Sequence, residues 1–144
     1  MGTETIKCLS IRQPWATWIM LGKKNIETRS WKCSHTGPLL IHAGLNDSAM
    51  RSRECRNIML DYGLVHESYP VGVILGAVTM KGCYPVSAYL PNLRKRELEM
   101  GDYSAGRYGW LLEVKNVFKS PVKYTGKLGL FDVPVAELGG QYHA

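Results

Sequence analysis

The sequence predicts an α+β fold: a small β-barrel of five to seven mostly short strands, with two or three helices packed outside it. Short apolar or alternating runs recur along the chain, and turns with glycine and proline separate them, which is typical of strands in a small barrel. Two or three other stretches have helical spacing instead. The 144 residues suffice for one domain with its own core, so a single domain is expected over residues 1–144.

The strands are expected where apolar residues alternate or form short unbroken runs. These segments are 5–11, 26–31, 39–43, 73–80 and 108–118, followed by 121–124 and 128–133 as a last strand or turn pair. The run from Val73 to Met80 is the most apolar, which indicates a central strand. Gly76 inside this run predicts a bulge, a bend or the close approach of another backbone.

Proline and glycine bound the first expected helix. Pro14 suits a first helical turn because it has no N–H to donate, and Gly22 ends the helix because glycine readily adopts a left-handed conformation. Its apolar stripe is Trp15, Trp18, Ile19 and Leu21.

The remaining segments contain a second helix, an insert and a tail. The second helix is expected from Asn46 or Asp47 to about Tyr62, with Gly63 after it. Residues 85–103 are interpreted as a short helical insert or an ordered loop. The residues after about 135 are expected to form a flexible C-terminal tail.

The charge of the chain favours a polyanionic partner. Eighteen Lys and Arg residues against twelve Asp and Glu give a net charge of +6, which favours RNA or DNA. No apolar run approaches the length of a membrane span, so no membrane partner is expected. The N-terminus lacks the pattern of a signal peptide, which favours an intracellular protein, cytoplasmic or nuclear.

The cysteine spacing argues against a metal centre. The chain has four cysteines, at positions 8, 33, 55 and 83, and no C-x-x-C pair. We therefore expect reduced, mostly buried thiols, with no metal and no cofactor.

The segment from Gly22 to Trp31 concentrates chemistry at the exit of the first helix. Glu27, Arg29 and Trp31 alternate on one face of the expected strand, and Lys24 lies at the junction. Three interpretations remain open. The cations bind phosphate while Glu27 accepts from a base amine; or a lysine of lowered pKa and a carboxylate hydrolyse an amide; or Glu27 and Arg29 form a structural ion pair.

The spacing Gly-x-Lys-x-x-Glu-x-Arg resembles the signature of the ASCH domain, a small β-barrel related to the PUA-like RNA-binding folds. Four further segments resemble that family in the same order along the chain: Leu9–Ala16, Gly37–Ala43, Tyr69–Gly76 and Tyr108–Glu113. The chain most resembles the ASCH modules of transcription coactivator proteins and their free-standing relatives. A transcription-related protein complex is therefore a further possible partner.

The resemblance implies a nucleic-acid-binding domain with a basic cleft at the motif, contacting phosphate and an unpaired base. The residues expected to contact RNA or DNA are Gln13, Trp15, Lys23, Lys24, Glu27, Arg29, Trp31 and Arg107. Trp15 and Trp31 are the candidate stacking planes, and Arg107 belongs to a polar, aromatic cluster that would line the far wall of the cleft.

The alternative is a metal-independent hydrolase that uses Lys24 and Glu27 as catalytic residues. Some small bacterial ASCH proteins hydrolyse acetylated cytidine with a lysine, a threonine and a glutamate, and others are described as ribonucleases. Lys24 matches that lysine, whereas Glu27 stands at the threonine position. Glu97 and Glu99 are the acids in the region where that glutamate falls.

Overall fold

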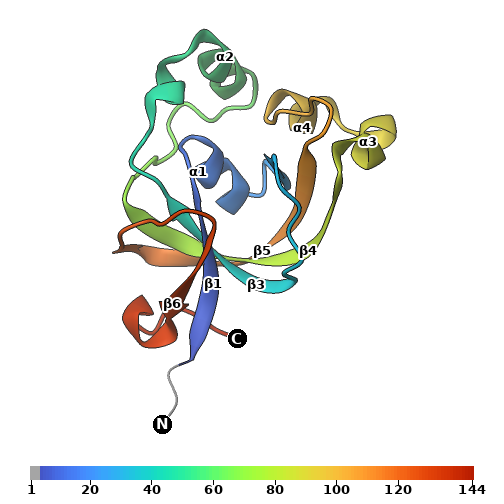
Figure 1. Cartoon of the computed structure of the whole chain (residues 1–144). Coiled ribbons are helices and arrows are strands. Elements are labelled where there is room, and N and C mark those ends of the chain that lie inside the picture. The colour runs from blue at the N-terminus through green and yellow to red at the C-terminus, as the bar shows by residue number, and fades with distance from the viewer. Residues whose placement is uncertain (1–3) are drawn as a thin grey trace.

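Six strands form one mixed sheet in the order β2-β5-β4-β3-β1-β6 (Figure 1). The computed structural model of the chain describes residues 4–144. The strands are β1 (Thr5–Ile11), β2 (Ile26–Arg29), β3 (Gly37–Ala43), β4 (Val73–Pro85), β5 (Tyr108–Lys123) and β6 (Leu130–Pro134). Only β1 and β3 run parallel, and the other four neighbouring pairs are antiparallel. Of the two segments expected as a last strand or turn pair, 121–124 falls largely at the end of β5 and 128–133 overlaps β6.

Four short α-helices connect the strands in the described part of the chain, one more than expected. They are α1 (Trp15–Met20), α2 (Arg53–Asp61), α3 (Val86–Tyr89) and α4 (Lys95–Glu99), and 3-10 turns lie at Ser48–Arg51, Leu90–Asn92 and Val135–Leu138. The helix expected from Asn46 or Asp47 is broken at Ser52. This residue has an extended backbone, and its hydroxyl accepts from the Cys55 N–H and so caps α2.

The sheet is open rather than closed into the expected barrel, although the α+β class and the strand number are confirmed. It curves around α1 (Figure 1). β6 pairs with β1 only as far as Leu9, so the end of β1 has a free edge. Arg29 of β2 reaches this edge, where its Nη2 donates to the Ser10 carbonyl at 2.9 Å. A side chain therefore joins the seam that backbone pairing leaves open.

The main core lies between α1 and the concave face of the sheet. It contains Ile19 of α1 together with Leu39, Val78 and Trp110 from three strands. Five of the six residues of α1 are buried, because the sheet surrounds one side and the α2 region covers the other. Leu21, expected on the apolar stripe, is 41% exposed beyond the end of the helix.

The convex face carries a second core that includes the C-terminal segment. Leu138 is fully buried there beside Phe118 and Val133. The Gln141 amide accepts from the Ser120 N–H at 2.9 Å and donates to the Ser120 carbonyl at 2.7 Å. The segment up to Gln141, expected to form a flexible tail after about residue 135, thus contacts β5 in this structure.

Within residues 4–144 there is no helix of the length and apolarity that a membrane crossing requires.

The backbone of β5 passes so close to Gly76 that no side chain fits there. A Cβ at Gly76 would lie 2.4 Å from the Asn116 carbonyl oxygen and 2.7 Å from Met20 Cε. The expected close approach at this glycine is confirmed, and it lies at a shift in the β4–β5 register.

We expect Gly76→Ala to lower the free energy of unfolding by about 2 kcal/mol, since the strands or α1 must move apart. Gly44→Ala is the matched control, because its Cβ would meet Ser10 Oγ only at 3.4 Å. Urea unfolding of both variants measures the difference. Equal stability of the two variants would contradict the packing described here.

Candidate functional site

A cleft of about 590 Å³ opens along the seam between β1 and β2. Its lining residues come from the end of β1, the start of α1, the β2 motif and the α4–β5 connection. They are Ser10, Ile11, Arg12, Trp15, Lys24, Glu27, Thr28, Arg29, Glu99, Met100, Gly101, Asp102 and Arg107. The open seam of the sheet is thus the place where the charged motif lines a cleft.

Lys24 forms the floor of this cleft and is only 1% exposed. Its Nζ donates to the Ile26 carbonyl at 2.7 Å and to the Met100 carbonyl at 2.8 Å. Glu27 Oε1 lies 4.0 Å from the same Nζ, at the distance of an ion pair. Burial lowers the pKa of Lys24, and the nearby carboxylates of Glu27 and Glu97 oppose this effect. The ammonium therefore ties the motif to the α4–β5 connection.

Glu27 and Arg29 emerge from the same face of β2, as the alternation predicted. Arg29 Nε donates to Glu27 Oε2 at 2.9 Å, while Nη2 of the same guanidinium binds Ser10 across the seam. Glu27 is buried and accepts from one cation while facing another. The result is a row of lysine, carboxylate and guanidinium along β2.

A second carboxyl group, Glu97, lies behind Lys24. Its Oε1 accepts from the Asn25 N–H, and its buried Oε2 has no partner among the described residues. Burial raises the pKa of Glu97, and the Asn25 N–H and the Lys24 charge oppose the rise. The Tyr103 hydroxyl is also buried without a described partner, and the Glu97 charge adds to the burial that raises its pKa. Two buried polar atoms in this region, Glu97 Oε2 and the Tyr103 hydroxyl oxygen, therefore have no hydrogen-bond partner among the described residues.

Arg107 braces the opposite wall of the cleft. Its Nη2 donates to the Thr28 carbonyl at 3.0 Å and its Nε to the Asp102 carbonyl at 3.2 Å. The Asp102 N–H in turn donates to the Thr28 hydroxyl at 3.1 Å. Hydrogen bonds from Ser104, followed by the Arg107 charge, lower the pKa of Asp102. The wall is thus fixed to β2 by two hydrogen bonds, both to Thr28, and is braced internally by a third.

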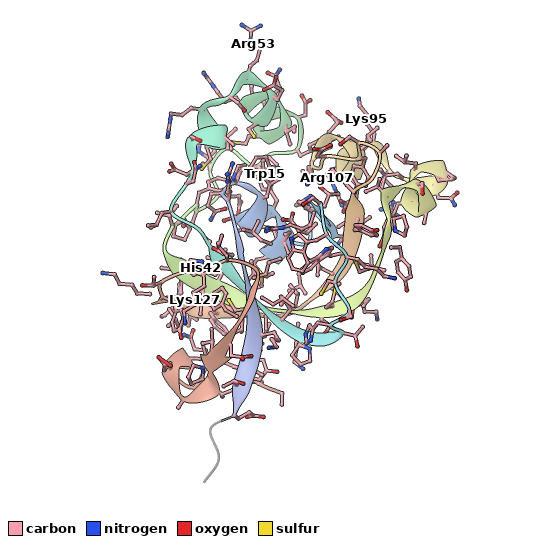
Figure 2. The ribbon with its side chains drawn as sticks, viewed as in Figure 1. Trp15, His42, Arg53, Lys95, Arg107 and Lys127 are labelled. Carbon is pink, nitrogen blue, oxygen red and sulfur yellow. The ribbon has the colours of Figure 1, made fainter. Side chains whose placement is uncertain are left out.

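The structure brings together five of the eight predicted contact residues. Trp15, Lys24, Glu27, Arg29 and Arg107 line the cleft. Figure 2 shows Trp15 and Arg107 on the same side of the sheet. Lys23 is exposed next to the cleft without lining it.

The other two predicted contact residues do not face the cleft. Gln13 is fully buried, where its amide bonds the Thr17 backbone and hydroxyl and the Pro70 carbonyl. Trp31 packs edge-on against Trp110 at 4.8 Å between ring centroids, because β2 ends at Arg29 and the alternation stops there. Gln13 and Trp31 therefore do not line the cleft, although Trp31 is 37% exposed elsewhere.

Sequence reasoning missed Arg12 and Thr28 as lining residues. Arg12 is exposed directly after β1, and the described residues offer its side chain no hydrogen bond or ion pair. Its place after the first strand, just before the Pro14 turn, was the available signal. Thr28 was assigned to the opposite face of β2, and it joins the lining because the cleft extends around this edge strand.

A chain of hydrogen bonds runs through the sheet beside the cleft. His42 Nε2 donates to the Tyr124 carbonyl at 2.7 Å, since a carbonyl only accepts. His42 Nδ1 must then accept from the Ser10 hydroxyl at 2.8 Å. His42 is buried with both ring nitrogens bonded, which is a structural role rather than that of a catalytic base. In the described residues, no group of three His, Cys, Asp or Glu side chains is arranged to hold a metal ion.

The buried Glu97 predicts a pH dependence of stability. Its pKa lies above the ordinary value of 4.5, so between these two values the folded chain holds a proton that the unfolded chain has released. Its contribution is complete below pH 4.5 and is lost as the pH rises through the folded pKa. Relative to Glu97→Gln, the parent chain should therefore lose free energy of unfolding across that window.

Urea titrations at a series of pH values measure this difference between Glu97→Gln and the parent. Glu67→Gln, at an exposed position, is the control and should keep a constant offset from the parent. If the free energy of unfolding of Glu97→Gln also differs from that of the parent by the same amount at every pH, the pKa of Glu97 is not raised by folding.

Comparisons with known proteins agree with this architecture. The sequence model of the ASCH domain matches residues 9–124. Activating signal cointegrator 1 of Homo sapiens is 34% identical over 83 residues, as is its counterpart from Mus musculus. The match covers 53% of this chain but only 14% of either relative. The crystal structure of a ZmASCH mutant protein from Zymomonas mobilis superimposes with a TM-score of 0.57 at 14% identity, over 94% of this chain and 95% of that one. The chain therefore belongs to the ASCH domain family.

Proposed function

We propose that the chain is a nucleic-acid-binding ASCH domain whose cleft takes one unpaired nucleotide of RNA or DNA. The observation that carries this proposal is the combination of three arginines, Arg12, Arg29 and Arg107, with a buried carboxylate inside the same cleft. Cations suit the phosphate of a nucleotide, and a carboxylate suits the amino group of a base.

The arginines retain donors for phosphate. A guanidinium has five N–H donors, and both Arg29 and Arg107 use only their Nε and Nη2 groups in the described contacts. Arg12 has no described partner at all. Arg12 can therefore bind a phosphate without breaking a hydrogen bond to the folded chain. The guanidiniums of Arg29 and Arg107 are already oriented by their hydrogen bonds.

The interior suits a base. Glu27 has acceptor positions beyond those facing Arg29 and Lys24, since a carboxylate offers about four. Ile11, Met100 and the half-buried Trp15 supply apolar surface and one aromatic plane for stacking.

The dimensions select a single nucleotide rather than a duplex. The cleft volume of about 590 Å³ falls within the range of small-ligand pockets. A paired base could not reach Glu27, so we expect recognition of single strands, loops or flipped bases. The cleft does not distinguish the two sugars, so both RNA and DNA are candidate ligands.

We expect Arg12→Ala to weaken binding of a single-stranded oligonucleotide by roughly tenfold. The slope of log K against log salt concentration should also fall by about 1, because one phosphate contact is lost. Fluorescence anisotropy across a salt series measures both quantities for RNA and DNA. Arg53→Ala removes an equally exposed arginine from α2, outside the cleft, and should change neither. Equal effects of the two variants would indicate only diffuse attraction.

A second candidate function is hydrolysis of an amide on a modified nucleoside. It is favoured by one observation: a lysine of lowered pKa lies at the floor of the cleft, 4.0 Å from Glu27 and next to the buried Glu97. A lysine whose pKa is lowered is more readily deprotonated, and the neutral amine can act as a base or a nucleophile. The departure at position 27, a glutamate where the hydrolases have threonine, weighs against it.

If this second function holds, acetylcytidine should be converted to cytidine and acetate. Glu27→Gln, which keeps the size of the side chain, should then lose at least about a hundredfold in rate. Chromatography of the nucleosides measures the conversion, and Glu54→Gln on α2 is the exposed control. The absence of conversion by the parent chain would leave binding alone.

The curated relatives carry the name of a signal cointegrator. We propose that the domain serves within a protein assembly concerned with transcription, which would place its nucleic-acid binding beside partner proteins. Co-purification that persists after nuclease treatment would separate a protein contact from a nucleic-acid bridge.

A further inference from the structure

A second hollow, which we call the lysine groove, lies away from the cleft and shares no lining residue with it. Its volume is about 940 Å³. One side is formed by Leu45 after β3 and by Val71, Gly72 and Val73 at the start of β4. The other side is formed by the end of β5 and the loop after it, which contribute Pro121 and the segment 123–127. Figure 2 shows Lys127 on the flank of the molecule, near His42 and away from Arg107.

The lining of the lysine groove combines apolar surface with one sign of charge. Leu45, Val71, Val73, Pro121 and Tyr124 make up most of the surface. Lys123 and Lys127 are its charged lining residues, and no acid lines it. Neither lysine forms an ion pair with another described residue. The groove therefore complements a ligand that is both apolar and negatively charged.

One large apolar side chain is exposed at this groove: Leu45 is 78% exposed and lines it. An isolated exposed leucine is common on protein surfaces, whereas an exposed leucine in the wall of an apolar hollow is typical of a binding surface.

The wall formed by residues 124–127 is held rigidly. The Tyr124 N–H donates to the Gly72 carbonyl at 3.0 Å, and the Tyr124 carbonyl accepts from His42. The Tyr124 ring stacks on Phe131 with 14° between the planes. A Cβ at Gly126 would lie 2.8 Å from the His42 ring, so the loop packs directly on the histidine. A preformed wall of this kind lowers the entropy lost on binding.

We infer that the lysine groove binds a peptide segment of a partner protein that combines large apolar side chains with Asp or Glu. A peptide is favoured over nucleic acid because the lining is largely aliphatic and because the one aromatic ring, Tyr124, is already stacked. The lysines select acidic residues at the rim, and the apolar floor takes leucine-like side chains.

The probe is a random peptide library displayed on phage and selected on the full chain, followed by synthesis of the enriched sequence. We expect enriched peptides that carry acidic residues next to large apolar ones. The synthetic peptide should bind the Lys123→Glu, Lys127→Glu double variant at least tenfold more weakly than the parent. Leu45→Ser, at an exposed position, should weaken binding without affecting folding.

The matched control is the Lys115→Glu, Lys119→Glu double variant. It makes the same change of charge at exposed positions of β5 outside the groove, and should bind the peptide with no more than a small loss. The same loss in both double variants, or selected peptides without acidic residues, would overturn the proposal. An oligonucleotide that displaces the peptide would assign the groove to nucleic acid and would equally overturn it. The Arg12→Ala variant should bind the peptide normally, which separates this surface from the cleft.

Discussion

The buried ammonium of Lys24 is the interaction on which the site depends. It is withdrawn from water and compensated by the carbonyls of Ile26 and Met100, which belong to segments more than seventy residues apart in sequence. An ammonium at this depth is tolerated because two of its donors bond carbonyl oxygens and a carboxylate lies 4.0 Å away. In return, it fixes β2 against the α4–β5 connection, and these two segments form the floor and one wall of the cleft. The functional groups nearer the solvent are aligned by a residue that solvent hardly reaches.

Whereas Lys24 is buried, the open seam of the sheet is partly exposed to solvent and is closed by a side chain rather than by backbone pairing. β2 is too short and too displaced to pair with β1, so Arg29 makes the connection that a ladder of backbone bonds would make in a closed barrel. A side-chain junction leaves space beside it, whereas a continuous ladder would not. The same guanidinium also holds Glu27, so closure of the fold and orientation of the carboxylate depend on one group. This arrangement explains why the charged motif of β2 lies at an irregular part of the structure.

The sequence predicted those parts of the fold that depend on local pattern. Alternation located β1 and the central strand, and Gly22, with φ of 74°, ends the first helix as expected. The side-by-side placement of Glu27 and Arg29 follows from the same period of two. The depth of Lys24 and its bond to Met100 could not be predicted, because they depend on contacts between distant segments.

The errors have the same origin. Trp31 was predicted on the Glu27 face by extending the alternation past the end of β2. Gln13 was predicted as a contact residue, but the core supplies partners for its whole amide. The C-terminal segment looked unstructured because its partners are the backbone groups of Ser120, which no sequence pattern marks. The α2 region was predicted as one helix because the sequence pattern does not distinguish a serine that caps a helix from a serine inside one. In the structure Ser52 caps α2 and so separates it from the preceding turn.

The hydrogen bonds through His42 give the two openings of the molecule a shared component. Tyr124 borders the lysine groove, Arg29 lines the cleft, and the path between them runs through the imidazole and Ser10. These hydrogen bonds join the loop after β5 to the backbone of β1 at the residue whose carbonyl Arg29 binds. Any energetic coupling along this path would have to act equally in both directions, because linkage between two binding sites is reciprocal.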